Sequence, residues 1–236
     1  MVRRADVEVA AGARVTLGAA APVFPSALRL VHEDEDLLVV EKPPGLLTIA
    51  TERERGRTAY RLLFDYLHPR ARLFIVHRLD RETSGLLVFA KSAAVKRALQ
   101  AQFAARTVER GYVALVEGRV RDDAGTLRDR VAEDPATLRV RTVRGGRGRE
   151  AITVYRVRER RARSTLLELS LGTGRRGQIR AHLAALGHPI VGDRAFGAAT
   201  DPVHRVCLHA SLLAFADARG RPRRFTSPEP PAFSRA

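Results

Sequence analysis

Two apolar runs separated by a short polar segment constrain the fold of this chain more than any other feature. Residues 73–76 and 85–89 are apolar and contain β-branched or aromatic side chains, so each run predicts a buried strand. The polar turn between them carries Asp80, with Arg78 and Arg81 on either side. A side chain at the point where a strand becomes a loop is presented to a cleft by a rigid scaffold.

The chemistry expected of Asp80 follows from its neighbours. Nearby cations favour the ionised form of a carboxyl group, so Asp80 is expected to be charged at neutral pH. A charged carboxylate can act as a nucleophile or an electrostatic stabiliser and is a poor general acid. The same pattern also fits a structural ion pair at a strand end, with Thr83 and Ser84 satisfying the turn. The local sequence leaves both interpretations open.

Hydrophobic periodicity along the rest of the chain predicts an α+β fold. Apolar residues recur at helical spacing in residues 57–67, in a segment that Ser92 caps and that runs to about residue 105, and in residues 178–186 before Gly187. Further strands are predicted at residues 113–116, 152–157 and 166–171. Because strands outnumber helices and several join through short turns, we expect a largely antiparallel sheet.

The formal net charge of +16 predicts a polyanionic partner, because arginine and lysine neutralise phosphates and release their counterions. Nearly all of this charge is arginine, which also indicates a compositional bias. The single cysteine, Cys207, excludes an intramolecular disulfide and a multi-cysteine zinc cluster. No apolar stretch is long enough to span a membrane, and the N-terminus does not have the pattern of a signal peptide. A cytoplasmic protein is therefore expected.

The positive charge is concentrated in one segment of the chain. Ten arginines and only two acidic residues lie in residues 139–163, with RGGRGRE at the centre. Glycines make this centre a flexible hairpin loop between strands, whose arginines can bind phosphates or stack on unpaired bases. We expect Arg144, Arg147 and Arg149 to contact RNA; the alternative is a solvated loop without contacts.

Several longer motifs closely resemble those of the RluA-type pseudouridine synthases. The segment around Asp80, HRLDRETSGLLVFAK, matches the signature of that family. Upstream, DEDLLVVEKPPGLLT is similar to its opening strand and Lys-Pro-x-Gly turn. Downstream, ERGYVALVEG with Tyr112, TGRRGQIRAHLAALGHPIVGD and LHASLLAF follow in the family's order. The resemblance covers roughly residues 28–230, and several motifs in register are a specific signal.

The resemblance implies both a fold and an activity. The fold is α+β, with a mixed, largely antiparallel sheet in two halves flanked by helices and a central active-site cleft. The activity is isomerisation of specific uridines to pseudouridine in ribosomal or transfer RNA, with RNA as the partner. Independently of the resemblance, the histidine spacing has no metal-binding pattern and no glycine-rich phosphate loop opens a helix, so no metal and no cofactor are expected. Residues 28–236 would form this catalytic domain as a monomer without an obligatory protein partner. Residues 1–27 would be an extension, a short hairpin or a remnant, too short for a complete S4-type RNA-binding domain.

The resemblance also implies roles for individual residues. Asp80 is the essential carboxylate, Tyr112 stacks on the target base, and Arg180 pairs with the aspartate. Four further residues are implied in substrate binding: Arg78, which fills the gap left by the extruded nucleotide, Arg175, which contacts phosphate, and Ile179 and Leu183, which line the site. Without the resemblance, a tyrosine on a half-buried strand, helix-end surface charges and ordinary core packing would explain the same residues.

One position departs from the family pattern, and two other functions compete with the isomerase. Relatives often carry histidine before the Gln-Ile-Arg triplet, where this chain has Gly177. A non-catalytic RNA-binding or ribosome-assembly protein could retain the fold, and a hydrolase acting on nucleosides is a weaker alternative. The joint presence of Asp80, Tyr112 and Arg180 favours the isomerase, because a degenerate site should lose at least one of them.

Overall fold

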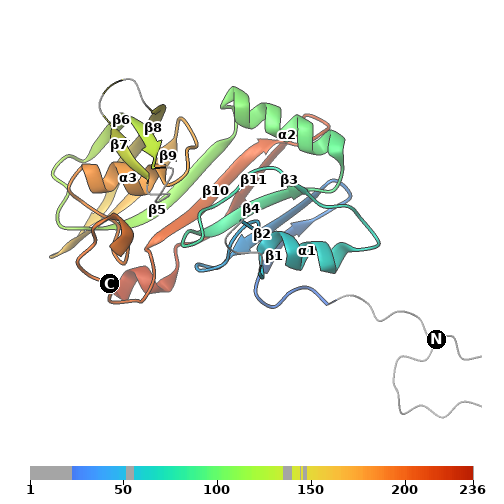
Figure 1. Cartoon of the computed structure of the whole chain (residues 1–236), viewed down its shortest axis with the longest axis horizontal. Coiled ribbons are helices and arrows are strands. Elements are labelled where there is room, and N and C mark those ends of the chain that lie inside the picture. Colours follow the sequence, from blue (N-terminus) through green and yellow to red (C-terminus); the bar gives the residue numbers. More distant parts are fainter. Residues whose placement is uncertain (1–22, 52–55, 135–139, 144, 146–147, 236) are drawn as a thin grey trace, which may run out of the picture.

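A single sheet of eleven strands forms the framework of the protein (Figure 1). The computed structural model describes residues 23–51, 56–134, 140–143, 145 and 148–235. Its strands are β1 Arg29–Glu33, β2 Leu37–Lys42, β3 Phe74–Ile75, β4 Ser84–Ala90, β5 Glu109–Glu117, β6 Ala124–Glu133, β7 Val140–Val143, β8 Arg149–Arg160, β9 Ser164–Leu171, β10 Leu208–Ala216 and β11 Pro222–Thr226. The main path of the sheet is β1-β2-β4-β10-β5-β9-β8-β6-β7, while β11 pairs with β10 and β3 pairs with β4.

The two halves of the sheet meet where β4 lies parallel to β10, with Ser84 opposite His209 and Gly85 opposite Ala210. The other pairs of named strands in the described part of the chain are antiparallel. Gly85 has a φ of +113°, and a Cβ atom there would lie 2.3 Å from the carbonyl oxygen of Ala210. Glycine is therefore required for the two backbones to approach so closely.

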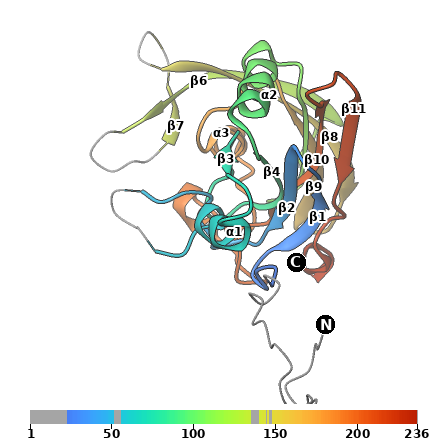
Figure 2. The same ribbon diagram turned by 90° about the vertical axis from the view of Figure 1, so that its right-hand side faces the viewer.

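Helices cover both faces of the N-terminal half of the sheet. In β2, Leu38 packs in one apolar cluster with α1 (Ala59–Leu67), and Leu37 packs in another with α2 (Ala93–Ala105). Successive side chains of a strand point to opposite faces, so α1 and α2 lie on opposite sides of this half (Figure 2). Burial on both faces explains why this strand is a continuous apolar run.

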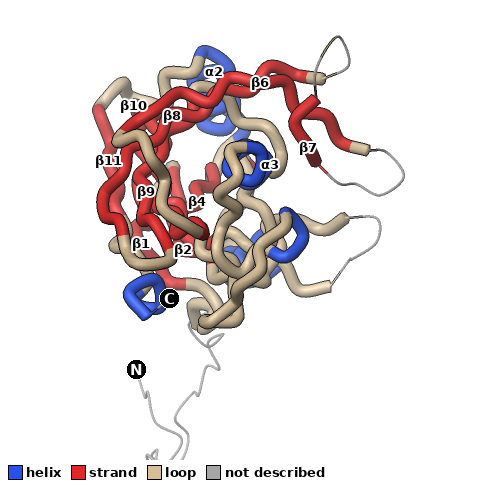
Figure 3. Tube along the Cα trace, turned by 90° about the vertical axis from the view of Figure 1, so that its left-hand side faces the viewer, coloured by secondary structure: helices blue, strands red, loops and turns tan. Residues whose placement is uncertain are grey.

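The C-terminal half of the sheet carries the third helix. Helix α3 (Gln178–Ala185) lies beside β6, β7 and β8 (Figure 3). Its apolar residues join a cluster with β5 and β9 and with Phe233, which is fully buried. Two short 3₁₀ helices, η1 Arg194–Phe196 and η2 Pro231–Arg235, complete the described elements. No helix in the described residues is both long and apolar enough to cross a membrane.

The helices and strands predicted from periodicity are confirmed, and so is the cap at Ser92, whose side chain accepts a hydrogen bond from the N–H of Val95. Thr58, which was not among the predicted caps, caps α1 in the same way by accepting from the N–H of Arg61. The fold class is confirmed as well: a mixed, largely antiparallel sheet in two halves with flanking helices. The predicted strand at residues 73–76 is shorter, because only Phe74 and Ile75 pair with the end of β4. The remaining residues continue as the loop that leads to Asp80.

The hairpin predicted in the arginine-rich segment is wrong. Strands β7 and β8 follow one another in the chain but pair with opposite edges of β6, so that Arg130 faces both Val143 and Glu150. The connection between them therefore joins two strands that β6 separates. Arg144 and Arg147 lie outside the described residues. So do residues 1–22, which hold most of the predicted N-terminal extension.

Candidate active site

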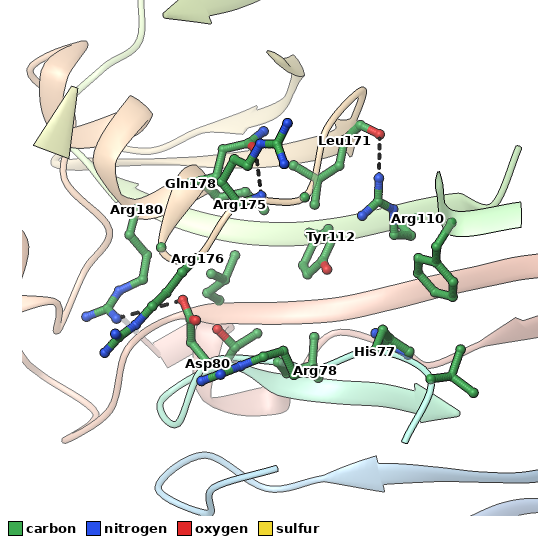
Figure 4. Close-up of a pocket in the computed structure, with 18 residues that line it drawn as sticks. His77, Arg78, Asp80, Arg110, Tyr112, Leu171, Arg175, Arg176, Gln178 and Arg180 are labelled. Atoms are coloured by element: carbon green, nitrogen blue, oxygen red, sulfur yellow. Dashed lines mark hydrogen bonds and ion pairs between the residues drawn. The ribbon is translucent and has the colours of Figure 1, made fainter. Parts of the chain in front are cut away.

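A cavity of about 300 Å³ lies where the two halves of the sheet meet (Figure 4). The β3–β4 loop supplies one wall, and β5 with the segment before and within α3 supplies the other. Its lining residues are Val76, His77, Arg78, Leu79, Asp80, Thr83, Phe103, Arg110, Tyr112, Leu171, Gly174, Arg175, Arg176, Gly177, Gln178, Ile179, Arg180 and Leu208. The fold therefore brings together the three residues predicted to be catalytic.

The loop that carries Asp80 is held by hydrogen bonds on both sides of the aspartate. Before it, the hydroxyl of the buried Thr48 donates to the carbonyl of Leu79 at 3.0 Å and accepts from the Leu79 N–H at 3.2 Å. The carbonyl of Asp80 itself accepts from the N–H of Thr83 at 3.2 Å. These contacts leave the carboxylate free to face the cavity, where 21% of its side chain is exposed.

The side chain of Lys42 fixes the other end of this loop. Its ammonium group donates to the carbonyls of Pro43 and Leu46 at 2.8 Å and to that of Arg81 at 2.9 Å, although the residue is almost completely buried. Burial lowers the pKa of Lys42 to about 7. This lysine belongs to the Lys-Pro-x-Gly turn noted in the sequence, where no local pattern indicated a contact with a loop 39 residues away.

Arg180 reaches Asp80 from α3, but its main partner is another residue. Its Nε and Nη2 atoms each donate to Asp193 at 2.6 Å, while Nη1 lies 4.0 Å from a carboxylate oxygen of Asp80. The Asp193 side chain is 1% exposed, and the ring of Phe196 lies 4.4 Å from the guanidinium. The pairing predicted for Arg180 and Asp80 is thus a longer contact, and Asp193 orients the guanidinium toward the cavity.

Tyr112 points into the cavity from β5, between the Asp80 end and the opposite end (Figure 4). Burial raises the pKa of its phenol to about 12. The phenol therefore stays protonated at neutral pH, which makes it a flat, neutral surface and a hydrogen-bond donor. A phenolate acting as a general base is disfavoured by the same burial.

The turn before α3 is organised by Gln178. Its side-chain carbonyl accepts from the Thr173 hydroxyl at 2.7 Å and from the Arg175 N–H at 3.0 Å, which holds Arg175 at the cavity wall. Gly177 caps the helix with a φ of +59°. A Cβ atom there would lie 3.3 Å from Val140 and 3.4 Å from Phe196, so this crowded left-handed position suits glycine.

The remaining predicted residues divide between the cavity and the core. Arg78 is exposed and lines the cavity. Ile179 is buried and lines the cavity as well. Leu183 is fully buried in the C-terminal core and does not line the cavity, so the prediction that it contacts substrate is corrected. Leu183 lies one helical turn after Ile179 on the same face of α3, and both join the C-terminal core cluster, but Ile179 alone of the two reaches the cavity wall. Arg149 lies in an adjoining hollow that shares Arg175 with the cavity.

The cavity is lined by one carboxylate, one flat aromatic ring and several guanidinium groups, an arrangement that can bind a planar ligand. Within the described residues, no group of three or more His, Cys, Asp or Glu side chains could hold a metal ion. Asp80 is the carboxylate that faces this cavity beside Arg180. Lys42 and Asp193 lie in motifs noted in the sequence, but their roles depend on contacts that only the folded chain makes.

Comparison with known proteins connects this geometry to a family. The family model described as RNA pseudouridylate synthase matches residues 36–185. A Bacillus subtilis protein named as an uncharacterized RNA pseudouridine synthase is 36% identical over 79% of this chain, and the ribosomal large subunit pseudouridine synthase D of Xylella fastidiosa is 37% identical over 86% of it. The chain spans 63% and 66% of the length of these two relatives.

Solved structures agree with this comparison. Human RNA pseudouridylate synthase domain containing 1 superposes with a TM-score of 0.71 at 25% identity, covering 91% of this chain and 87% of its own. The human domain containing 4 protein superposes with a TM-score of 0.72, covering 87% of this chain and 90% of its own. The family model, the sequence relatives and the similar structures agree, so the chain belongs to the RNA pseudouridylate synthase family of the RluA type.

Proposed function

We propose that this protein is an RNA pseudouridine synthase that isomerises uridine in large-subunit ribosomal RNA, with Asp80 as the essential carboxylate. The observation that carries the proposal is the placement of Asp80 beside Arg180 and facing Tyr112 in one cavity built by both sheet halves. The relatives named as large-subunit synthases support ribosomal RNA as the substrate class.

The reaction breaks the C1′–N1 bond of uridine, turns the detached uracil and joins C1′ to C5. C5 then loses its proton and N1 gains one, so the product is an isomer and no redox change occurs. Asp80 acts at the ribose or the base while its charge is balanced by Arg180. Tyr112 stacks against the uracil, and the walls of the cavity retain the base between the two bond changes.

The target uridine must leave its stack to reach Asp80, because the reacting atoms are covered inside folded RNA. Arg78 is exposed at the mouth of the cavity and can occupy the space that the extruded nucleotide leaves. Arg175 and Arg149 extend the positive surface into the adjoining hollow, where the RNA backbone would pass.

The test uses unmodified large-subunit ribosomal RNA, incubated with purified protein and mapped by pseudouridine-specific chemistry. The wild type should modify defined uridines and Asp80→Asn should modify none, while Asp65→Asn, an exposed carboxylate on α1, should retain activity. Product formation by Asp80→Asn would contradict the role of Asp80. Binding by wild-type protein without any product would favour a non-catalytic RNA-binding protein, modification of transfer RNA alone would change the substrate, and release of free uracil would indicate a hydrolase.

A further inference from the structure

Arg110 lines the active-site cavity at the end opposite Asp80 and has no role in the chemistry described above. It lies two residues before Tyr112 on β5, so both side chains point to the same face of the sheet. In Figure 4, Arg110 and His77 lie on one side of Tyr112, while Asp80 and Arg180 lie on the other.

The hydrogen bonds of Arg110 leave part of its guanidinium unused. Its Nη2 atom donates to the carbonyls of Leu171 and Thr173 at 3.2 and 3.4 Å. Its Nε–H is buried and has no hydrogen-bond partner. In the described part of the chain, Nη1 makes no hydrogen bond, and no carboxylate lies within ion-pair distance of Arg110. Arg180, in the same cavity, has two such carboxylates.

A partly buried cation without a counter-charge is energetically unfavourable in the free protein. Desolvation penalises the charged guanidinium, and burial lowers the pKa of Arg110, although an arginine remains protonated at neutral pH. The two carbonyls and the ring of Phe103, whose centroid lies 5.7 Å away, offset only part of this cost. An anionic ligand would supply the missing counter-charge.

The backbone around Arg110 leaves room for its guanidinium in this position. A Cβ atom on Gly174 would lie 2.4 Å from Nη1, so a larger residue at position 174 would displace the group. Gly174 also lines both the cavity and the adjoining hollow that contains Arg149 and Arg175. The unpaired cation therefore lies next to a residue that the cavity shares with the adjoining hollow, where the RNA backbone would pass.

We propose that Arg110 binds a backbone phosphate of the RNA next to the target uridine, forming a second anion subsite in the cavity. The proposal rests on the proposed function, because the ligand is the RNA substrate. A phosphate matches both the net charge and the free N–H groups of Nη1, whereas a base carbonyl would use the hydrogen bonds and leave the charge unbalanced.

The experiment measures binding of unmodified large-subunit ribosomal RNA across a range of salt concentrations, in the Asp80→Asn background so that no reaction proceeds. Arg110→Gln should weaken binding roughly tenfold and reduce the slope of log affinity against log salt by about 0.7 to 0.9. Arg110→Lys should keep the slope. Arg219→Gln, an exposed arginine in the β10–β11 turn that pairs with Glu35, is the matched control and should change neither quantity.

A second variant perturbs the subsite without removing a charge. Gly174→Ala should displace the guanidinium and weaken binding while every arginine is retained. With otherwise wild-type protein, Arg110→Gln should raise KM more than it lowers kcat, because the contact is made in the bound RNA before reaction. Equal stability of the variants, measured by urea unfolding, separates this effect from a structural one.

Three results would overturn the proposal. The first is an unchanged slope of log affinity against log salt for Arg110→Gln, and the second is wild-type affinity of Gly174→Ala for the RNA. The third is a fall in the kcat of Arg110→Gln without a change in that slope, which would indicate that Arg110 contacts the uracil instead. The proposed function is tested separately by product formation. If Asp80→Asn is inactive while Arg110→Gln keeps the full slope, only the phosphate subsite is wrong.

Discussion

Replacing Asp193 with alanine should both destabilise the fold and impair the reaction. Asp193 accepts two hydrogen bonds from Arg180 at 2.6 Å, and its side chain is 1% exposed. Removing one partner of a buried ion pair leaves the other charge uncompensated, which costs about 3 to 5 kcal/mol. Among the described residues, Asp80, at 4.0 Å, would be the remaining carboxylate within ion-pair distance of Arg180.

The free energy of unfolding is measured by urea denaturation at pH 7, and activity by the rate of pseudouridine formation at saturating RNA. Asp123→Ala is the matched control, because Asp123 also contacts an arginine, Arg160, at 2.6 Å but is 89% exposed. A solvent-exposed pair contributes at most about 1 kcal/mol. If the alanine variant of Asp193 does not fold, Asp193→Asn is used in its place. Its amide retains one hydrogen-bond acceptor, and its free energy of unfolding should be about 2 kcal/mol lower than that of the wild type.

Two results would refute this reasoning. If Asp193→Ala and Asp123→Ala lost the same free energy of unfolding, burial would not determine the strength of the pair. If a folded Asp193 variant kept the wild-type kcat, orientation of Arg180 by Asp193 would not be needed for the reaction. A positioning role predicts a fall in kcat with little change in KM.

Two further predictions concern stability. Burial lowers the pKa of His209 to about 4. Between about pH 6.5 and pH 4, His209 is therefore protonated in the unfolded chain but neutral in the folded protein, so the free energy of unfolding falls as the pH drops through this range. Between pH 7 and pH 5, urea unfolding of the wild type should show a loss about 2 kcal/mol greater than that of His209→Gln; equal losses would contradict it. Gly85→Ala should abolish soluble expression, because its Cβ atom would overlap the Ala210 backbone. Gly220 also has a positive φ but has open surroundings, so Gly220→Ala should lower the free energy of unfolding by only about 1 to 2 kcal/mol. Equal yields of the two glycine variants would refute the steric argument.

Local patterns were sufficient for the three helices, for several of the strands and for the central residue of the site. The strand after Asp80, the cap at Ser92 and the strand that carries Tyr112 depend on neighbouring residues, so periodicity and capping chemistry predicted them. The short strand before Asp80 was overestimated, since its length is set by the partner strand and not by its own apolar residues.

The sequence by itself determined the three helices, several of the strands, the position of Asp80 in a polar turn and the family to which the chain belongs. Tertiary structure alone decided which charges pair: Asp193 takes the hydrogen bonds of Arg180, and Lys42 holds the loop after Asp80. Among the described residues, no carboxylate lies within ion-pair distance of Arg110. Tertiary structure also placed β7 and β8 on opposite edges of β6. The reason is physical, because secondary structure follows from contacts within a few residues, whereas ion-pair partners and strand order depend on segments far apart in the chain.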